Sequence, residues 1–189
     1  MLCERAVLNE AVCATLRAAL DTNGTGSTDS VDGLREHVLY LSAVELEATI
    51  GGEAMRRLLT LPLRFRDVVD SDGGGGSRGA GGGARDEYVF FDCFLRRYSS
   101  GTLGEGGGDD QLLTSFHADA AALTVNVALT SDTDHEGGTL LGLYGGEVRA
   151  VLRGCGDATV HSSALLHGVT RMRAGVRYSM ILFFARGTR

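Results

Sequence analysis

The stretch HADAAALTVNVALT, residues 117–130, contains the pattern that decides the fold. From Leu123 onward, apolar residues alternate with polar or smaller ones over eight positions. Because successive side chains of a β-strand point to opposite faces, this period of two predicts a strand with unlike faces. Leu and Val occupy one face, and Thr, Asn and Ala occupy the other.

Three further segments in the second half of the chain predict strands. The strongest covers 176–184. Its alternating faces are Val176, Tyr178, Met180, Leu182 and Phe184 on one side and Arg177, Ser179, Ile181 and Phe183 on the other. Weaker or shorter patterns occur at 148–153 and 158–161, and pairs of glycines punctuate the region. Several short strands with glycine turns are typical of an antiparallel sandwich or barrel, which we place from about Glu87 to Phe184.

The first 70 residues predict helices, which we interpret as a support for the β domain. Four apolar residues recur every four positions, as on one face of a helix: Leu8, Val12, Leu16 and Leu20. Ser42 and Glu45 have the spacing of a capping box, so a second helix is expected to begin near Ala43. After two glycines it resumes over 54–59, and 64–69 is predicted to be a strand.

Two glycine-rich segments predict flexible surface loops. Residues 71–84, SDGGGGSRGAGGGA, hold eight of the 28 glycines, and residues 101–110 are similar. Neither contains a dinucleotide-binding fingerprint or the lysine of a phosphate-binding loop. The expected organisation is a helical region over 1–70, a glycine-rich loop over 71–86 and a β core over 87–187.

The charge balance excludes several functions. The 189 residues include 18 basic and 24 acidic ones, which gives a net charge of −6, and every basic residue is Arg. A negative chain lacks the electrostatic footprint of a nucleic-acid-binding protein. Without Lys there is no Schiff-base chemistry, and a substrate carboxylate held by a cation must be held by Arg.

The cysteines and the N-terminal sequence favour an intracellular protein. The four cysteines are scattered without CxxC spacing, which argues against a zinc site or a disulfide scaffold. Charged residues interrupt the first 20 positions, so no signal-peptide core is expected there. No later segment reaches the roughly 18 apolar residues of a membrane span.

His117 and Asp119 stand just before the alternating strand. In an extended segment, residues i and i+2 point to the same side, so the imidazole and the carboxylate are aimed at one point. His167 lies further along the chain, after another predicted strand. Two His and one carboxylate form the facial set that binds non-haem Fe(II) and leaves coordination positions open.

Arg177 follows His167 by ten residues and lies on the strongest predicted strand. An Arg that points into a β domain needs an anion, because a buried unpaired charge is costly. A carboxylate bound through two hydrogen bonds is the natural partner, and Ser179 on the same face can add another bond. The sequence therefore predicts metal ligands together with a carboxylate-binding group.

The other three histidines are weaker candidates. His161 also lies ten residues before an arginine, Arg171, but that arginine falls in an expected turn rather than on a strand. His135 is the alternative on the proximal side, in a polar loop where it is expected to be solvated or at the mouth of the site. His37 has no partner at ligand spacing.

Five blocks resemble, in order, the Fe(II)/2-oxoglutarate dioxygenases of the prolyl 4-hydroxylase type, and most closely the part of that superfamily with the procollagen lysyl hydroxylases. The blocks are Arg97-Tyr98, His117–Leu129, Glu136–Thr139, His167–Val169 and Gly175–Tyr178. The resemblance as a whole covers roughly 88–187, about half of the chain. The resemblance implies an α+β, mainly β protein, with a double-stranded β-helix (jelly-roll) core preceded by N-terminal helices.

The resemblance also implies roles for single residues. Those expected at the metal and the cosubstrate are His117, Asp119 and His167 as iron ligands, with Arg177, Tyr98, Asn126 and Ser179 around 2-oxoglutarate. Arg177 matches the residue that binds the distal carboxylate, and Ser179 matches the serine of an Arg-x-Ser pair. Tyr98 matches a tyrosine that reaches the cosubstrate, although the segment 99–116 makes its spacing longer than usual. Asn126 matches a position that lines the cosubstrate pocket.

The implied activity is hydroxylation of a C–H bond coupled to decarboxylation of 2-oxoglutarate, with Fe(II) and O2, giving succinate and CO2. A prolyl or lysyl side chain of a peptide or protein is the expected substrate, and ascorbate is an expected reductant. Two alternatives stay open: a β-barrel metal-binding protein without turnover, and a cupin-like enzyme that uses O2 without 2-oxoglutarate and has no need of Arg177. The net charge of −6 disfavours a nucleic-acid demethylase.

Overall fold

The computed structural model describes residues 1–28, 35–72, 87–99 and 112–187. The segments predicted as glycine-rich loops lie outside these residues, apart from Ser71 and Asp72, which end the third helix. No helix in the described ranges is long and apolar enough to cross a bilayer.

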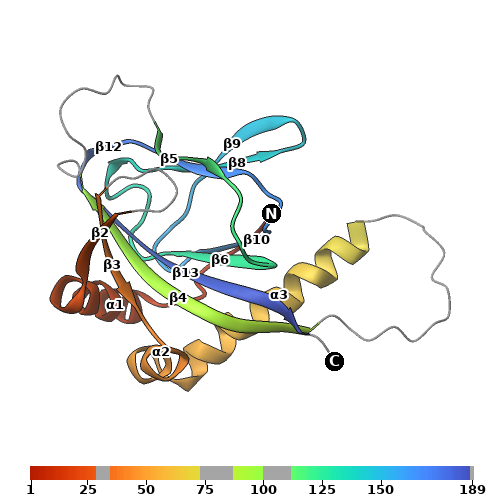
Figure 1. The fold of residues 1–189 in the computed structure, drawn as a ribbon, viewed down its shortest axis with the longest axis horizontal. Coiled ribbons are helices and arrows are strands. Elements are labelled where there is room, and N and C mark those ends of the chain that lie inside the picture. The colour runs from red at the N-terminus through yellow and green to blue at the C-terminus, as the bar shows by residue number, and fades with distance from the viewer. Residues whose placement is uncertain (29–34, 73–86, 100–111, 188–189) are drawn as a thin grey trace.

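The described residues form three helices and two main antiparallel sheets (Figure 1). The helices are α1 (Glu10–Asn23), α2 (Ala43–Ile50) and α3 (Gly52–Asp72). In spatial order, the seven-stranded sheet consists of β1 (Leu2–Glu4), β10 (Ala158–Ser162), β6 (Leu123–Ala128), β13 (Val176–Gly187), β4 (Glu87–Ser99), β3 (Arg35–Tyr40) and β2 (Thr25–Thr28). The four-stranded sheet consists of β5 (Leu112–His117), β11 (His167–Thr170), β8 (Leu140–Tyr144) and β9 (Glu147–Val151), and β12 (Met172–Ala174) pairs with β7 (Glu136–Gly137).

The larger sheet lies between the helices and the smaller sheet (Figure 1). Antiparallel sheets in two layers, with helices on the outer side of one layer, form a jelly-roll core with helical support. The predicted fold class is therefore confirmed.

The main core lies between the helices and the larger sheet. Its buried apolar side chains include Leu16, Leu20, Leu46, Leu58, Cys93, Leu95, Val125, Val127, Met180, Leu182 and Phe184. The faces predicted from the alternation over 123–130 and 176–184 match this arrangement, because the apolar face of β6 and of β13 is turned towards the helices. Their other faces are turned towards the smaller sheet.

Side-chain caps fix the starts of two helices. The Asn9 side chain accepts a hydrogen bond from the backbone N–H of Val12 at the start of α1. At α2, the predicted capping box between Ser42 and Glu45 is present in both directions. These caps satisfy backbone donors that have no partner within the helix.

The third helix is longer than the sequence patterns predict. The strand predicted over 64–69 is wrong, because this segment continues α3 to Asp72. Leu58, Leu61 and Phe65 recur at helical spacing and pack on the main core, and this packing favours helix over an isolated strand.

Three strands of the N-terminal region have no signature in the sequence. β1 pairs with β10 at one edge of the larger sheet, and β3 pairs with β4 towards the other edge, with β2 beyond it. The segments LCE and TGST are too short or too polar to show a period of two. β1 pairs with a strand far along the chain, and β2 pairs with β3, which in turn is held by the distant strand β4, so tertiary context decides their conformation.

Candidate functional site

The smaller sheet and the loop after β5 bring His117, Asp119 and His167 together. His117 ends β5 and pairs with His167 at the start of β11, and Asp119 follows two residues later. One ligand atom from each residue lies within 4.8 Å of the other two. Nε2 of His117 is 3.6 Å from Oδ1 of Asp119, and Nε2 of His167 is 3.7 Å from Oδ2.

Backbone carbonyls orient both imidazoles. Nδ1 of His117 lies 2.8 Å from the carbonyl oxygen of Ser115, and Nδ1 of His167 lies 3.2 Å from that of Leu165. A carbonyl oxygen can only accept, so each Nδ1 carries the proton, and each Nε2 presents a lone pair on the side of Asp119. This is the tautomer that a metal ligand requires when it binds through Nε2.

The charge states also suit a metal. Burial raises the pKa of Asp119, but the neighbouring imidazoles of His117 and His167 and a hydrogen bond of 2.6 Å donated by Thr124 outweigh it and lower the pKa to about 2. Burial lowers the pKa of His167. At neutral pH the carboxylate is therefore ionised beside a His167 ring that burial keeps neutral, and this donor set fits Fe(II).

Arg177 lies on the face of β13 that is turned towards these residues, and it is only 2% exposed. Its Nη1 is 3.3 Å from Oγ of Ser179. Nε and Nη2 are buried and have no hydrogen-bond partner among the described residues. Burial lowers the pKa of this guanidinium, and Tyr98 and Asp132 oppose that effect. A buried cation with unsatisfied donors is a site for an anion.

Tyr98 and Asn126 border the same space. Tyr98 lies opposite Arg177 in the β4–β13 pairing, and its hydroxyl accepts a hydrogen bond from Nη1 of Arg96 at 3.3 Å. Asn126 lies on the more polar face of β6, where its Oδ1 accepts a hydrogen bond from Nη1 of Arg153 at 2.8 Å. The structure thus brings all seven predicted site residues to one cavity.

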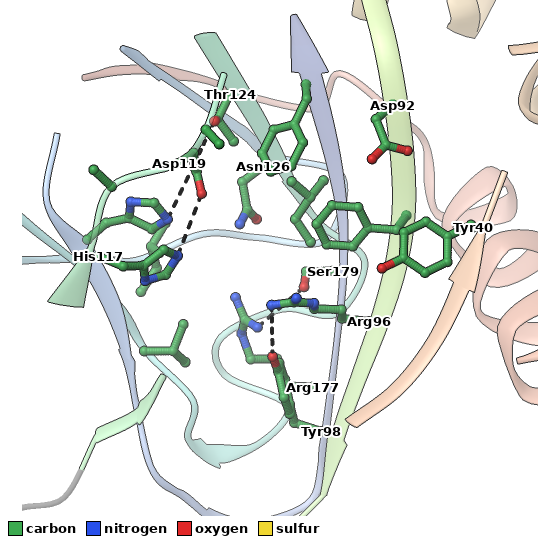
Figure 2. A pocket seen from close by; sticks show the side chains of 18 residues that line it. Tyr40, Asp92, Arg96, Tyr98, His117, Asp119, Thr124, Asn126, Arg177 and Ser179 are labelled. Carbon is green, nitrogen blue, oxygen red and sulfur yellow. Dashed lines mark hydrogen bonds and ion pairs between the residues drawn. The ribbon is translucent and has the colours of Figure 1, made fainter. Parts of the chain in front are cut away.

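That cavity has a volume of about 310 Å³ and lies between the two sheets. Figure 2 shows His117 and Asp119 on one side, with Arg177, Ser179 and Tyr98 across from them. On the side away from Arg177, aromatic side chains and Asp92 form the wall. The volume is in the range of pockets for small organic ligands.

The alternative ligand His161 is buried beside the site but is not part of the metal-binding group. Its ring centroid is 4.6 Å from that of His167, and its Nδ1 donates to the carbonyl oxygen of Ser162 at 3.1 Å. Burial lowers its pKa to about 4, so the ring is neutral at neutral pH. Within the described residues, the group that can hold a metal contains His167 and not His161.

The structure corrects the expectation for His135. Its side chain is 0% exposed rather than solvated, with Nδ1 2.8 Å from the carbonyl oxygen of Gly137 and Nε2 3.9 Å from Oδ1 of Asp132. Gly137 and Asp132 of the same polar loop contact its ring nitrogens, so the loop composition misleads. His37 lies on β3, with Nε2 3.3 Å from the carbonyl oxygen of Leu20, away from the metal-binding group.

Several cavity residues escaped the sequence analysis. Thr124, which holds Asp119, and Arg153, which holds Asn126, are the polar contacts that it missed. The inner face of β4 also lines the cavity with Asp92, Phe94 and Arg96, which lead up to the predicted Tyr98. The alternation of these three residues with buried Cys93 and Leu95 is a period-two signal that could have revealed them.

No family model and no curated protein sequence matches the chain. Solved structures do match, at low identity. An oxidoreductase of the 2OG-Fe(II) oxygenase family from Burkholderia pseudomallei is 19% identical, with 97% of this chain and 83% of that chain covered and a TM-score of 0.59. A prolyl-4-hydroxylase from Pseudomonas putida is 15% identical, with 99% and 92% covered and a TM-score of 0.59.

HygX from Streptomyces hygroscopicus is similar to the same extent, in a structure with nickel, 2-oxoglutarate and hygromycin B bound. It is 15% identical, with 97% of this chain and 82% of that chain covered and a TM-score of 0.61. At such identities the likeness shows a shared fold.

Proposed function

We propose that the chain is an Fe(II)- and 2-oxoglutarate-dependent dioxygenase that hydroxylates a C–H bond and releases succinate and CO2. One observation carries the proposal: a single cavity combines a His–Asp–His group with a buried guanidinium whose Nε and Nη2 have no partner among the described residues. The fold shared with 2OG-Fe(II) oxygenases supports it.

His117, Asp119 and His167 would hold the metal through two Nε2 atoms and a carboxylate oxygen. When bound, iron supplies the O2 chemistry that couples decarboxylation of 2-oxoglutarate to hydroxylation. Thr124 keeps the Asp119 carboxylate in place through its hydrogen bond of 2.6 Å.

Arg177 would bind the carboxylate of 2-oxoglutarate that is farther from the metal. Its two unsatisfied nitrogens suit the two oxygens of a carboxylate, and Ser179 holds the third nitrogen at 3.3 Å. Tyr98 and Asn126 add a hydroxyl and an amide to the same wall. Burial of this wall excludes water, which strengthens each of these hydrogen bonds.

The proposed substrate is a prolyl or lysyl side chain of a peptide or protein, which the likeness to the Pseudomonas putida prolyl-4-hydroxylase supports. Ascorbate belongs to the proposal as the reductant that keeps the iron ferrous. Arg177 also bears on the alternatives, because a cupin-like enzyme that does not use 2-oxoglutarate would leave this buried cation without an anion.

Two substitutions test the proposal. Asp119→Ala should weaken Mn(II) or Fe(II) binding by at least about 100-fold, because it removes the only anionic ligand of the group, and should abolish succinate formation. Arg177→Gln should keep the metal affinity but raise the KM for 2-oxoglutarate roughly 100-fold, since charge-assisted hydrogen bonds contribute about 1.5–3 kcal/mol. Calorimetry measures the metal affinity, and succinate release measures turnover.

The matched control for Arg177 is Arg149→Gln, which removes the same charge from the exposed strand β9. This variant should behave like the wild type in both assays. Normal metal binding and turnover by the Asp119 variant would refute the proposed site.

A further inference from the structure

The floor of the cavity, formed by β4 and β13, differs in the type of side chain between its two ends. On β4, the side chains that face the cavity are Asp92, Phe94, Arg96 and Tyr98, and on β13 they are Arg177, Ser179, Ile181 and Phe183. The pairing places Arg177 opposite Tyr98 at one end and Phe183 opposite Asp92 at the other. Tyr98 follows Asp92 by six positions, which corresponds to about 20 Å of strand. A five-carbon diacid bound at Arg177 cannot reach the Asp92 end.

Aromatic rings form the wall at the Asp92 end (Figure 2). Phe94 lies with its ring centroid 5.6 Å from that of Tyr40 and 5.5 Å from that of Phe183. Tyr40 is 60% exposed, so this part of the cavity opens to solvent. Stiff aromatic side chains with exposed faces attract apolar groups and cations.

Asp92 is the carboxylate at this end, and it is partly buried. It has no hydrogen bond and no ion pair with any residue in the described part of the chain. The other carboxylates near the cavity differ, because Asp119 and Glu36 both have partners. A carboxylate beside aromatic rings, partly shielded from water, favours a cation over a neutral group.

Arg96 is the competing cation of this wall, and its charge is already balanced. Its Nε is 2.8 Å from Oε2 of Glu36, and its guanidinium lies 4.9 Å from the centre of the Phe94 ring. Arg96 and Glu36 together are neutral. Asp92 therefore gives the open end of the cavity its net negative charge.

Asp92 is also close to the proposed metal site. Thr124, which hydrogen-bonds Asp119, lies beside Phe183 in the β6–β13 pairing, and Phe183 lies beside Asp92 in the β13–β4 pairing. The backbones of Thr124 and Asp92 are thus two strand spacings apart, which corresponds to about 10 Å. A ligand held at Asp92 can thus extend to the metal while 2-oxoglutarate is held at Arg177.

We infer that Asp92, with Tyr40, Phe94 and Phe183, forms a subsite for a positively charged nitrogen of the substrate, an ammonium or a guanidinium. The inference rests on the proposed function, because it assigns this end of the cavity to the molecule that is hydroxylated. It gives the substrate a charge requirement that the ligand set and Arg177 do not provide.

Binding of small probes tests the inference on the full chain loaded with Mn(II) and 2-oxoglutarate. The cationic probes are the Nα-acetyl amides of lysine and arginine, and the neutral ones are those of norleucine and glutamine. Calorimetry or NMR titration should give at least about tenfold tighter binding of the cationic probes, as expected for a charge-assisted hydrogen bond. Asp92→Asn should remove this preference, and Tyr40→Leu should weaken binding of the cations several-fold.

The matched control is Glu53→Gln, which changes the net charge equally but lies on the exposed side of α3. It should leave the preference unchanged. Equal binding of charged and neutral probes, preference for a neutral probe, no binding of either cation, or an unchanged preference in Asp92→Asn would each overturn the subsite.

The same titrations keep the two hypotheses apart. A protein that binds Mn(II) and 2-oxoglutarate but does not discriminate the cations contradicts the subsite alone. A protein that binds the cations through Asp92 but not 2-oxoglutarate contradicts the proposed function, and the cation site then belongs to a different activity.

Discussion

Arg153 is buried next to the cavity without pointing into the space where a ligand would lie. Its Nη1 donates to Oδ1 of Asn126 at 2.8 Å, and Oδ2 of Asp132 accepts a hydrogen bond of 2.8 Å from its backbone N–H. Because Oδ1 of Asn126 is engaged, the Nδ2 amide is the group that it presents to the cavity. Burial lowers the pKa of Arg153 to about 10, but the side chain stays charged at neutral pH.

A substitution of Arg153 should therefore act through Asn126. Arg153→Met is expected to raise the KM for 2-oxoglutarate roughly tenfold with a smaller change in kcat, because it frees the Asn126 amide to rotate. Asn126→Asp keeps an acceptor for Arg153 but removes the donor, so it should raise the same KM. Steady-state kinetics on both single variants and the double variant checks this. Fully additive effects would show that the two residues act independently.

His161 should make the stability of the metal-free protein depend on pH. Burial lowers its pKa from 6.5 to about 4 in the folded state, so the unfolded chain binds the proton first as the pH falls. Stability is thus fully present above pH 6.5 and declines between 6.5 and 4, by about 3 kcal/mol.

Urea unfolding of EDTA-treated protein at several pH values measures this loss. His161→Gln should flatten the dependence in that window. The carboxylate of Asp119 does not interfere, because its lowered pKa of about 2 places its own effect below pH 4. A His161 variant with an undiminished slope would assign the effect to other groups.

At the scale of elements, the turn before β10 packs against the N-terminal segment and so holds that segment on the larger sheet. Gly156 has φ +82°, and a Cβ atom on it would lie 2.0 Å from the carbonyl oxygen of Leu8. The backbone N–H of Leu8 also donates to the carbonyl oxygen of Gly156 at 3.2 Å. This close approach sets the position of the chain just before α1.

Gly156→Ala should accordingly destabilise the protein by roughly 3 kcal/mol or more, because both the backbone conformation and the contact with Leu8 must change. Gly146→Ala is the matched control: its φ is +79°, but nothing lies within 4 Å of an added Cβ atom. That variant should lose only about 1 kcal/mol, the cost of the left-handed conformation. Equal losses on chemical denaturation would mean that the contact with Leu8 contributes nothing.

The elements that could be predicted from the sequence are those whose own residues alternate between a face on the apolar core and a face of different character. β6 and β13 show their period of two because Val125 and Leu182 pack on the helices while Asn126 faces the cavity. β1 and β2 show none, since backbone pairing holds them, β1 on the distant strand β10 and β2 on the edge of β3. The segment 64–69 was predicted as a strand but belongs to α3, because Phe65 packs on the core at helical spacing from residues earlier in that helix.

At the scale of the whole molecule, metal binding should stabilise the fold. The three ligands come from β5, the following loop and β11, so the metal links segments that are distant in sequence. Mn(II) at 100 times its Kd should raise the free energy of unfolding by about 2.7 kcal/mol, which corresponds to roughly 5–10 °C in Tm for a chain of this size. Thermal unfolding with and without Mn(II) measures the shift.

Asp119→Ala should show no such shift at the same Mn(II) concentration. The comparison matters because the chain has a net charge of −6 and attracts cations non-specifically. An equal shift in wild type and variant would attribute the stabilisation to that general attraction.

The site could be predicted in parts. The spacing of His117 and Asp119 indicated a shared direction. The position of His167 ten residues before Arg177, together with the resemblance to a family, indicated the third ligand, but the pairing between β5 and β11 that brings it to the other two has no local signature. The burial of His135 could not be predicted, since it depends on Asp132 and on the fold of a polar loop. Arg153 likewise acquires its role only through contact with a strand far away in sequence.

The alternation along β4 has a consequence for evolution. Cys93 and Leu95 belong to the apolar interior, whereas Asp92 and Phe94 belong to the ligand-facing wall. Neighbouring residues therefore have separate roles, one in stability and one in binding. Mutations at Asp92 or at Phe183 can alter which molecule is accepted and leave the packing under the helices intact. Such a fold is suited to diversification, because mutations on the cavity face can change the specificity without destabilising the protein.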